Sequence, residues 1–511
     1  MSYRDLEAAW AYHEGTKHSF YSIRASRHFL DWENQPLPYK IYLDLEPIPL
    51  LRELGPSAIP ALSVLRGEVV ERPEECVPEL PIISRLLYYS GGVTKRVSYP
   101  QGDKWFRAAS CTGALYHVDL YLVCGDLPQL EAGVYHFGVH DFALRRLRRG
   151  DFRGELLAAT AGETAVAHAP AVLVCTSTFW RNAWKYQART YRHCFWDAGM
   201  ILANLLGIAA AHYVPARVMC GFVDARVNRL LGLDPRREVS LALVSLGRTE
   251  RRIPPPPEVR PLELKTERLS QSEVDYPAIR AMHEASSLPE EPEVAAWRGA
   301  VSLARPPPSG QVFALPGLGS AELPPESIEE VILRRASTRR FARKPVGLGQ
   351  LATILETSSR PVAADFTATG EPLSDQYLIV NAVEGLPSGS HLCRSDQGTL
   401  ELLKEGDFRE TAGYLGLEQE LSADASADIF FLTDLRPILQ RFGNRGYRAA
   451  QLEAAIRAGR IYLTAYALRL GATGLTFYDD NVTEFFSPSA AGNSVMFLVA
   501  VGRPARRPTQ A

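Results

Sequence analysis

The tetrapeptide Gly150-Asp151-Phe152-Arg153 occurs again as Gly406-Asp407-Phe408-Arg409, 256 residues further along the chain (406 − 150). The same shift, or one of 255, relates other short matches: Tyr121-Leu122 with Tyr377-Leu378, Gly133 with Gly389, Arg189-x-Tyr191-Arg192 with Arg445-x-Tyr447-Arg448, Val227 with Val482, and Gly247-Arg248 with Gly502-Arg503. One such match could be a coincidence among common residues. A series of matches at nearly the same shift is hard to explain in that way. The series therefore indicates that the chain contains two tandem copies of one domain.

Each copy shows the same order of expected elements. Apolar strand-like runs precede a long helix, and an apolar strand follows it. These are the runs Leu120–Val123 and Ala171–Cys175, Tyr377–Val380 and Asp428–Leu432, the helices near Tyr191–Ala211 and Tyr447–Leu470, and the closing strands Val239–Leu246 and Ser494–Val501. The closing strands lack the alternation of half-buried strands, so both of their faces should be covered. The pattern predicts an α+β fold with helices packed on a central sheet.

Proline clusters separate the two copies. They are Pro254–Pro257 with Pro261, and Pro306–Pro308 with Pro316, Pro324 and Pro325. Proline fixes φ and lacks a backbone donor, so such runs favour extended connectors. We therefore predict an N-terminal domain over residues 1–250, a proline-rich linker over 251–325 with a short helix near Glu273–Ser287, and a C-terminal domain over 326–511.

The bulk composition narrows the class of protein. The 511 residues are 46% hydrophobic and 22% charged, with a net charge of −2, so no nucleic-acid or membrane partner is expected. The longest apolar run, Ala198–Ala211, is shorter than the roughly 20 residues that span a bilayer. Seven cysteines without a C-x-x-C pair suit reduced thiols in the cytoplasm. His18, His193 and His212 have no metal-ligand spacing, so we expect no metal site.

A basic motif opens the second copy. The stretch Ile332–Phe341 contains four arginines and two hydroxyl residues, at the expected end of a helix. Guanidinium and hydroxyl groups so close together can donate several charge-assisted hydrogen bonds to one dianion. A solvated basic helix end is the ordinary alternative for such a motif standing alone.

The sequence around this motif resembles the nitroreductase family. Arg-x-Ser-x-Arg-x-Phe (335–341), then Lys344-Pro345-Val346 and an amphipathic helix from Leu348, is similar to the family's N-terminal signature, which holds the phosphate of FMN. The resemblance implies that Arg335, Ser337 and Arg339 bind phosphate, with Arg503 added from the end of the last strand. It also implies two tandem nitroreductase-like domains, each with a central, mainly antiparallel sheet flanked by helices.

The first copy resembles the SagB-type (azoline) dehydrogenase branch of that family. The residues that carry this likeness are Tyr12–Ser19, Leu30-Asp31-Trp32 and Asn34-Gln35-Pro36, which are similar to the branch's leader segment, and Arg107–Tyr116, which is similar to its R-x-x-P-S-x-G-x-x-Y loop against the flavin ring. The loop departs from the pattern, because alanine or serine replaces the proline and Cys111 is added. Together the likenesses cover most of residues 12–250 and 325–505.

In this family FMN lies in a groove between two subunits, which implies that the halves pair as a pseudo-dimer. One groove would combine Arg335, Ser337, Arg339 and Arg503 with Arg107, Ser110, Thr112 and Gly113, and with the backbone amides of Gly474 and Leu475. The opposite groove would use Ile23–Arg27, Arg248 and Ser358–Gly370, where the loop pattern is absent. We expect one FMN per chain, with two equivalent flavins as the alternative. Further homodimerisation stays open.

The pair Lys185-Tyr186 matches the Lys-Tyr pair of azoline dehydrogenases. The implied reaction removes a proton from carbon with the lysine while a hydride moves to flavin N5, and the tyrosine orients the substrate or relays the proton. A surface lysine beside a core aromatic residue is the alternative. The second copy has Arg441-Phe442 there, so this chemistry would belong to the first copy alone.

These observations predict an FMN-dependent oxidoreductase that dehydrogenates an azoline-type heterocycle in a peptide or small molecule. Two alternatives remain at this point. One is an NAD(P)H-dependent nitro- or quinone-type reductase, and the other is a catalytically silent flavin-binding or scaffold subunit.

Overall fold

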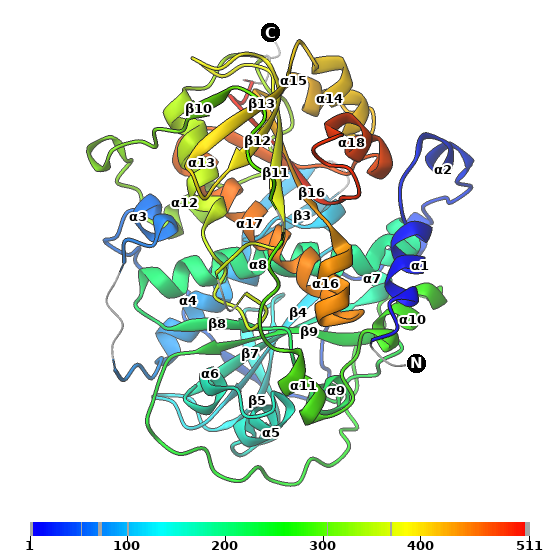
Figure 1. Ribbon diagram of the computed structural model, residues 1–511. Helices are drawn as coiled ribbons and strands as arrows, with labels where there is room; N and C mark the ends of the chain where they lie inside the picture. The colour runs from blue at the N-terminus through cyan, green and yellow to red at the C-terminus, as the bar shows by residue number, and fades with distance from the viewer. Residues whose placement is uncertain are drawn as a thin grey trace.

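The first half of the chain forms a seven-stranded antiparallel sheet. The computed structural model describes residues 4–52, 54–69, 74–99, 102–303, 305–367 and 370–505, and two large sheets lie at opposite ends of the molecule (Figure 1). The first sheet has the order β1-β6-β5-β4-β7-β9-β8. Its strands are β1 (Pro47–Pro49), β4 (Val118–Cys124), β5 (Gly133–Gly138), β6 (Ala143–Arg149), β7 (Ala171–Thr178), β8 (Ala216–Met219) and β9 (Glu238–Leu246).

The second half repeats this topology strand for strand. Its sheet has the order β10-β13-β12-β11-β14-β16-β15, and every pairing is antiparallel. Its strands are β10 (Val312–Ala314), β11 (Asp375–Val380), β12 (Gly389–Arg394), β13 (Thr399–Glu405), β14 (Ala427–Thr433), β15 (Gly471–Gly474) and β16 (Ser494–Gly502). The predicted fold class, two units each with a central antiparallel sheet flanked by helices, is confirmed.

Helices cover both sheets and fill the space between them (Figure 1). In the first half these are α1 (Glu7–Gly15), α2 (Phe20–Ala25), α3 (Ala61–Arg66), α4 (Leu80–Gly91), α5 (Arg153–Ala159), α6 (Thr164–Ala167), α7 (Phe179–Tyr186), α8 (Thr190–Ala211) and α9 (Asp224–Leu231). The second half has α12 (Ile328–Arg334), α13 (Leu348–Ser359), α14 (Arg409–Leu415), α15 (Glu420–Asp424), α16 (Leu435–Phe442), α17 (Arg445–Ala467) and α18 (Asp479–Phe486). The two predicted long helices are α8 and α17.

The repeated tetrapeptides occupy the same place in both halves. Each connects a strand to a helix, β6 to α5 and β13 to α14. In each, the aspartate carboxylate accepts a hydrogen bond from the backbone amide of the arginine two residues later, at 3.0 Å in the first half and 3.1 Å in the second. The tetrapeptide is therefore a turn that sets the entry of a helix.

Helices α8 and α17 join the halves by close packing of small residues. A Cβ atom built on Gly199 would lie 2.4 Å from the Cβ of Ala455, and one built on Gly459 would lie 2.4 Å from the Cβ of Ala203. Both contacts join a residue to its counterpart 256 positions away (455 − 199 and 459 − 203). Self-paired contacts of this kind mark the pseudo-twofold axis of a dimer-like arrangement.

Each half also sends two arginines into a buried aspartate of the other half. The arginines stand at the start of the long helix, and the aspartate begins the short helix between the last two strands of its half, α9 or α18. The contacts are Arg189 to Asp479 at 3.0 Å, Arg192 to Asp479 at 2.7 Å, Arg445 to Asp224 at 2.6 Å and Arg448 to Asp224 at 2.7 Å. We call these two clusters the reciprocal clasps.

The segment 251–325 contains more ordered structure than an extended linker. The short helix expected near Glu273–Ser287 is α10 (Pro277–Ala285), and α11 (Glu291–Trp297) follows it. In one clasp, Arg448 donates to the His283 carbonyl and to Ser286 Oγ, at 2.7 and 2.8 Å. In the other, α1 gives Arg192 the same two kinds of acceptor. The C-terminal end of α10 therefore accepts hydrogen bonds from the arginine of one clasp, as the C-terminal end of α1 does from the arginine of the other.

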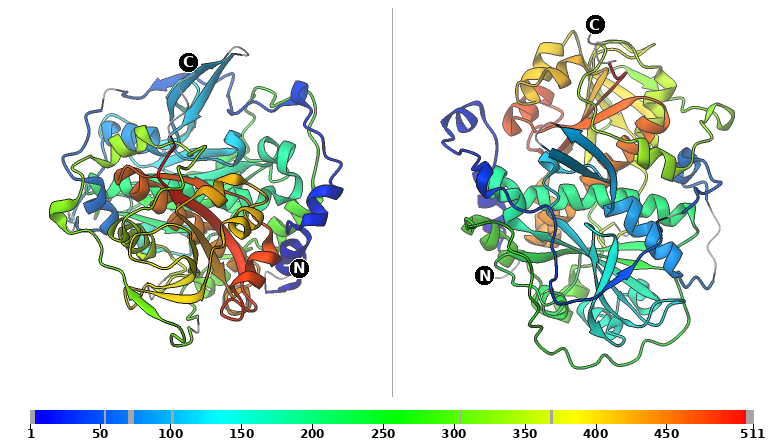
Figure 2. Two further views of the ribbon diagram at one scale, coloured as in Figure 1. Left: turned by 90° about the horizontal axis from the view of Figure 1, so that it is seen from above. Right: turned by 180° about the vertical axis from the view of Figure 1, so that it is seen from behind.

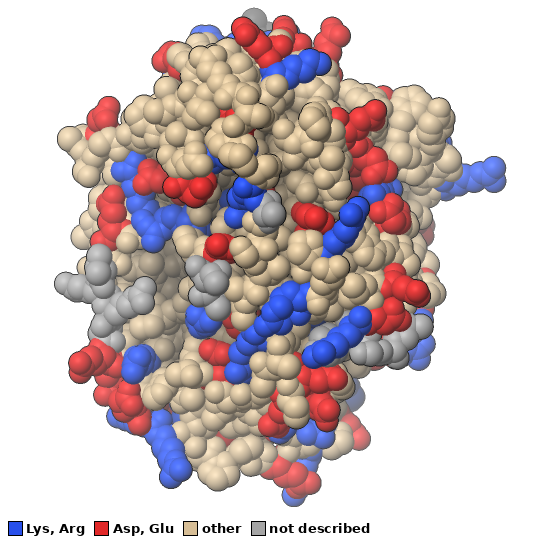
Figure 3. Space-filling view, viewed as in Figure 1, with Lys and Arg blue, Asp and Glu red and all other residues tan. Residues whose placement is uncertain are grey.

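One described stretch, Phe179–Ala211, is long and apolar enough to cross a membrane, with a mean hydropathy of 1.5, but 89% of that window is buried inside the protein. Because α8 lies between the two sheets, its composition is that of a core helix. Acidic and basic side chains are interspersed on the face shown in Figure 3. The first half also has a hairpin of β2 (Val93–Tyr99) and β3 (Gly102–Arg107), which projects from the body when seen from above (Figure 2).

Candidate active site

The loop that follows β3 is hydrogen-bonded to a buried acidic residue of α8, Asp197. The carboxylate of Asp197 accepts hydrogen bonds from Thr112 N at 2.9 Å, Thr112 Oγ1 at 2.8 Å, Cys111 Sγ at 3.0 Å and His117 Nε2 at 2.8 Å. Burial and the neighbouring carboxylate hold the pKa of the Cys111 thiol well above its usual value, so the sulfur stays protonated. The ligand atoms of Cys111, His117 and Asp197 lie within 4.8 Å of one another, but hydrogen bonds join them. The expectation of no metal site stays a prediction.

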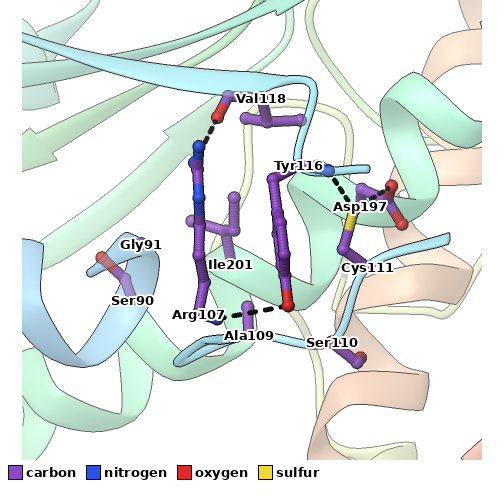
Figure 4. Close-up of a pocket in the computed structure, with 10 residues that line it drawn as sticks. All are labelled: Ser90, Gly91, Arg107, Ala109, Ser110, Cys111, Tyr116, Val118, Asp197 and Ile201. Carbon is purple, nitrogen blue, oxygen red and sulfur yellow. Dashed lines mark hydrogen bonds between the residues drawn. The ribbon is translucent and has the colours of Figure 1, made fainter. Parts of the chain in front are cut away.

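This loop borders a small cavity (Figure 4). The residues that line the cavity are Ser90, Gly91, Arg107, Ala109, Ser110, Cys111, Tyr116, Val118, Asp197 and Ile201. The side chain of Arg107 is 4% exposed, and it donates to the carbonyls of Pro38 and Val118. Arg107 therefore supports the loop with its guanidinium turned into the protein.

An arginine of the second half reaches across to this loop. Arg335 donates to the Ala108 carbonyl at 2.6 Å and to the Arg107 carbonyl at 3.3 Å. The structure thus brings together the two sequence motifs that were assigned to opposite sides of one groove.

The rest of the arginine motif lies beside β15 and the end of β16. Thr338 N donates to the Ala472 carbonyl at 3.0 Å, and Phe341 pairs with Pro504. Arg503, which is exposed, donates to the Pro345 carbonyl at 2.8 Å. Ser337 is half-buried, and Arg339 is exposed with no ion pair to any described residue. Their hydroxyl and guanidinium groups remain available to an anion.

Among the described residues, no backbone segment of the first half pairs with β15 at Gly474. The amide of Gly474 donates to the hydroxyl of Tyr462 from α17. The amide of Leu475 instead donates to the Leu498 carbonyl at 3.2 Å, so it is already used within the sheet. A Cβ atom on Gly474 would approach Phe497 and Tyr462 at 3.3 and 3.4 Å. Glycine keeps this edge accessible.

The opposite groove is filled at the corresponding edge. Val218 of β8, the counterpart of Gly474 (474 − 218 = 256), donates to the Ala363 carbonyl at 2.8 Å and accepts from Asp365 N at 3.1 Å. The Asp365 carboxylate accepts from the amides of Cys220 and Gly221 at 2.9 and 2.8 Å. Burial raises the pKa of Asp365 to about 6. The segment Ala363–Asp365 therefore occupies the place that lies open in the first groove.

Aromatic side chains complete this filling. Trp297 is 1% exposed, packs on Phe366 and Phe442, and donates to the Phe442 carbonyl at 2.9 Å. Residues 368 and 369 of the predicted ring-side segment Ser358–Gly370 lie outside the described residues.

Of the phosphate residues predicted for that groove, Arg248 follows β9 as Arg503 follows β16, whereas Ile23–Arg27 lies before α3 and not after it. Arg24 lies in α2 and pairs with Glu418 at 3.0 Å, and the backbone of Arg248 pairs with Cys76. The part of the first half that corresponds to 335–341 follows α3, because α3 and α12 occupy equivalent positions before the next helix. The prediction for Ile23–Arg27 is therefore corrected: this segment belongs to the N-terminal leader.

Lys185 and Tyr186 end α7 beside the first groove. A Cβ atom built on Gly113 would lie 2.8 Å from the Tyr186 hydroxyl, so the tyrosine rests on the Thr112–Gly113 turn. Burial raises the pKa of Tyr186 above its usual value, and the Asp197 carboxylate adds to the shift. The Lys185 ammonium lies 5.3 Å from the centroid of the Tyr186 ring and forms no hydrogen bond or ion pair with a described residue.

The N-terminal leader braces the end of α7. His28 Nε2 donates to the Trp184 carbonyl at 2.9 Å, Trp184 Nε1 donates to the Asp31 carbonyl at 3.0 Å, and Trp32 packs on Trp184. Sequence reasoning missed this brace, as it missed Asp197, His117 and Tyr462. A polar residue inside a long apolar helix, such as Asp197, was the signal that could have identified one of them.

Comparison with known proteins agrees with this geometry. Residues 112–248 match the sequence profile of the Nitroreductase family. A Methanocaldococcus jannaschii protein named as a nitroreductase is 24% identical over 166 residues, which are 32% of this chain and 79% of that protein. A crystal structure from Anabaena variabilis, also named as a nitroreductase, is 24% identical and covers 98% of this chain and 99% of its own, with a TM-score of 0.77. One from Ralstonia eutropha, 20% identical, covers 42% and 100%, with a TM-score of 0.30.

These comparisons give a family match for part of the chain and a fold match for nearly all of it. The first half of this chain carries a nitroreductase family domain, and the whole chain has the fold of the Anabaena variabilis protein.

Proposed function

We propose that the chain is an FMN-dependent oxidoreductase of the SagB-type branch, with one FMN in the first groove. Its substrate would be an azoline-type heterocycle in a peptide or a small molecule. The observation that carries this proposal is the difference between the grooves. In one, Arg335 meets the 107–116 loop and β15 is accessible; in the other, Ala363–Asp365 fills the same edge.

The donor set suits the two ends of FMN. A phosphate monoester needs several cationic and hydroxyl donors, and Arg335, Ser337, Arg339 and Arg503 offer them within one turn and the adjoining strand end. A flat ring needs a wall without bulky side chains, which the Thr112–Gly113 turn and Gly474 provide. We assign the phosphate to the arginine side and the ring to the glycine side.

The chemistry that bound FMN would supply is two-electron oxidation of the substrate, with molecular oxygen as the final acceptor of the electron pair. Lys185 would take the proton from the neighbouring substrate carbon, which leaves a new double bond in the heterocycle. The Tyr186 hydroxyl, held neutral by its raised pKa, would orient the substrate against the Thr112–Gly113 turn. The brace on Trp184 would fix both side chains.

Replacing the lysine tests the catalytic part of this proposal. We expect Lys185→Ala to keep its FMN, because no phosphate-side residue changes, and to lose azoline oxidation by about 10²-fold or more, the usual contribution of a general base. FMN release after denaturation and oxygen consumption with an azoline peptide measure the two effects. The matched control is Arg441→Ala at the second-half counterpart, which should turn over normally. Turnover by Lys185→Ala at the wild-type rate would remove the lysine from the mechanism.

Replacing the arginine tests the cofactor part. Wild-type protein should release one FMN per chain, and Arg335→Ala should release far less, because the cross-groove contact and a phosphate donor are both lost. Arg24→Ala, on the exposed leader, should retain one FMN. Two FMN per chain would contradict the filled second groove. Reduction of the flavin by NAD(P)H without an azoline would favour the nitro- or quinone-type reductase, and a colourless protein would favour the scaffold.

A further inference from the structure

Asp197 is a buried acid with an unusual set of partners. It stands in the middle of α8 and is 3% exposed. Its hydrogen bonds come from four donor atoms in the single short stretch Cys111–His117. His117 is fully buried, and its other ring nitrogen, Nδ1, forms a hydrogen bond with Ser177 Oγ of β7 at 2.8 Å. The carboxylate therefore ties the whole loop to the helix and, through His117, to the sheet.

The second half has an acidic residue at the corresponding position, and its partners are different. Its counterpart is Glu453 (453 − 197 = 256), which accepts from Ser374 Oγ at 2.8 Å and pairs with Arg457 at 3.2 Å. In the first half Ile201 replaces that arginine (457 − 201 = 256), and among the described residues no lysine or arginine lies within 4 Å of the Asp197 carboxylate. A buried carboxylate without a cation is costly unless several donors satisfy it. In the first half, this buried carboxylate without a lysine or arginine partner lies beside the proposed ring site.

The loop that Asp197 holds is also the surface on which Tyr186 rests. The Tyr186 hydroxyl lies against Gly113, directly after Thr112, whose amide and hydroxyl both donate to Asp197. A shift of the Thr112–Gly113 turn would therefore move the tyrosine and the wall of the groove together. Burial, together with the same carboxylate, raises the pKa of the Cys111 thiol next to the turn.

We propose that Asp197, with His117, is a positioning residue that locks the 111–117 loop so that Gly113 and Tyr186 hold the substrate side of the groove in place. It would act through the loop and Tyr186. The catalytic consequence rests on the proposed function, whereas the locking itself is a property of the protein alone.

The first experiment measures catalysis in the FMN-loaded protein. Asp197→Asn keeps the size of the side chain but loses the charge that the four donors share. We expect it to retain one FMN per chain, to change the visible circular dichroism of the flavin, and to lower kcat by about 10²-fold with little change in KM, as for a misplaced reacting group. Glu453→Gln is the matched control and should alter stability without changing the flavin spectrum or kcat. Thr112→Val, which removes the hydroxyl that donates to Asp197, should resemble Asp197→Asn in part.

The second experiment needs neither substrate nor flavin. Alkylation of Cys111, followed residue by residue with mass spectrometry, should be slow in the wild type and faster in Asp197→Asn. Amide exchange over 111–117 should rise in the same variant. Unchanged alkylation and exchange would overturn the locking, and wild-type kcat in a loosened loop would overturn its catalytic consequence. A wild type without flavin or azoline turnover would instead contradict the proposed function and leave the locking to be judged by these two measurements.

Discussion

Gly113 shows how a single residue can set the shape of the groove. Its φ is +63°, in the left-handed region that favours glycine, and its Cα faces the Tyr186 hydroxyl. A side chain here would meet two penalties, one from the backbone and one from the tyrosine. The residue therefore links local backbone geometry to the position of the proposed catalytic pair.

Gly113→Ala should separate these penalties when it is compared with Gly162→Ala. Gly162 has a similar φ of +69° but nothing within 4 Å of an added Cβ, so both variants should lose about 1 kcal/mol of stability from the backbone. Only Gly113→Ala should displace Tyr186 and reduce azoline turnover. Urea unfolding and steady-state rates measure the two effects. Equal turnover in both variants would show that Tyr186 tolerates the shift.

Among single residues, the sequence predicted those that belong to a contiguous motif. Arg335 was recognisable because six neighbours repeat a known pattern, and the structure places it at the predicted loop. Arg107 and Leu475 lay in equally recognisable segments, yet the guanidinium of one and the amide of the other are bonded inside the protein. Which way a side chain or an amide points depends on tertiary packing, which a local pattern does not encode.

At the scale of elements, the reciprocal clasps are the strongest polar contacts between the halves. Both aspartates are buried, and each receives two guanidinium groups and a backbone amide from the leader or from residue 288. The arginine pairs hold the pKa of Asp224 at about 2 and that of Asp479 lower still, against the cost of burial. Ionised clasps therefore favour the folded, paired state.

The lowered pKa of Asp224 makes the stability of the fold depend on pH in a definite direction. A carboxyl whose folded pKa lies below its unfolded value of 3.8 stabilises the fold above that pH, and the stabilisation is lost as the pH falls from about 4 towards 2. We expect the urea midpoint to fall steeply over this window, with Asp224 contributing on the order of 2 kcal/mol. Asp224→Asn should lower the midpoint at pH 7 and flatten the acid limb. Parallel acid limbs in the two proteins would contradict this assignment.

Elements were predicted better than their connections. The two long helices and the closing strands follow directly from apolar runs, and the observed bounds agree within a few residues. The role of α10 was not visible, because His283 and Ser286 match His13 and Thr16 at a shift of 270 (283 − 13), outside the register of the main repeat. When the connection between two elements differs in length between the copies, a comparison of the sequence with itself at one fixed shift does not find the repeated residues.

At the scale of the whole molecule, contacts from both halves build each end of the groove, so the linker should hold the halves close without being needed for their pairing. The stretch Glu258–Arg260 is largely exposed. We expect a protease site inserted there to give two fragments that co-elute, because the clasps and the α8–α17 contact remain. Size-exclusion chromatography with FMN quantitation measures this. Fragments that separate at neutral pH would show that the covalent connection carries the pairing.

The filled second groove has a consequence for how such a chain can change. In a homodimer every mutation appears twice, so a tryptophan that blocked one cleft would block both and abolish activity. One polypeptide that encodes both halves escapes this symmetry: Asp365 is buried in one groove, and the residue at the corresponding position of the first half is Ala109 (365 − 109 = 256). Covalent fusion thus allows one groove to be filled while the other is kept for a ligand.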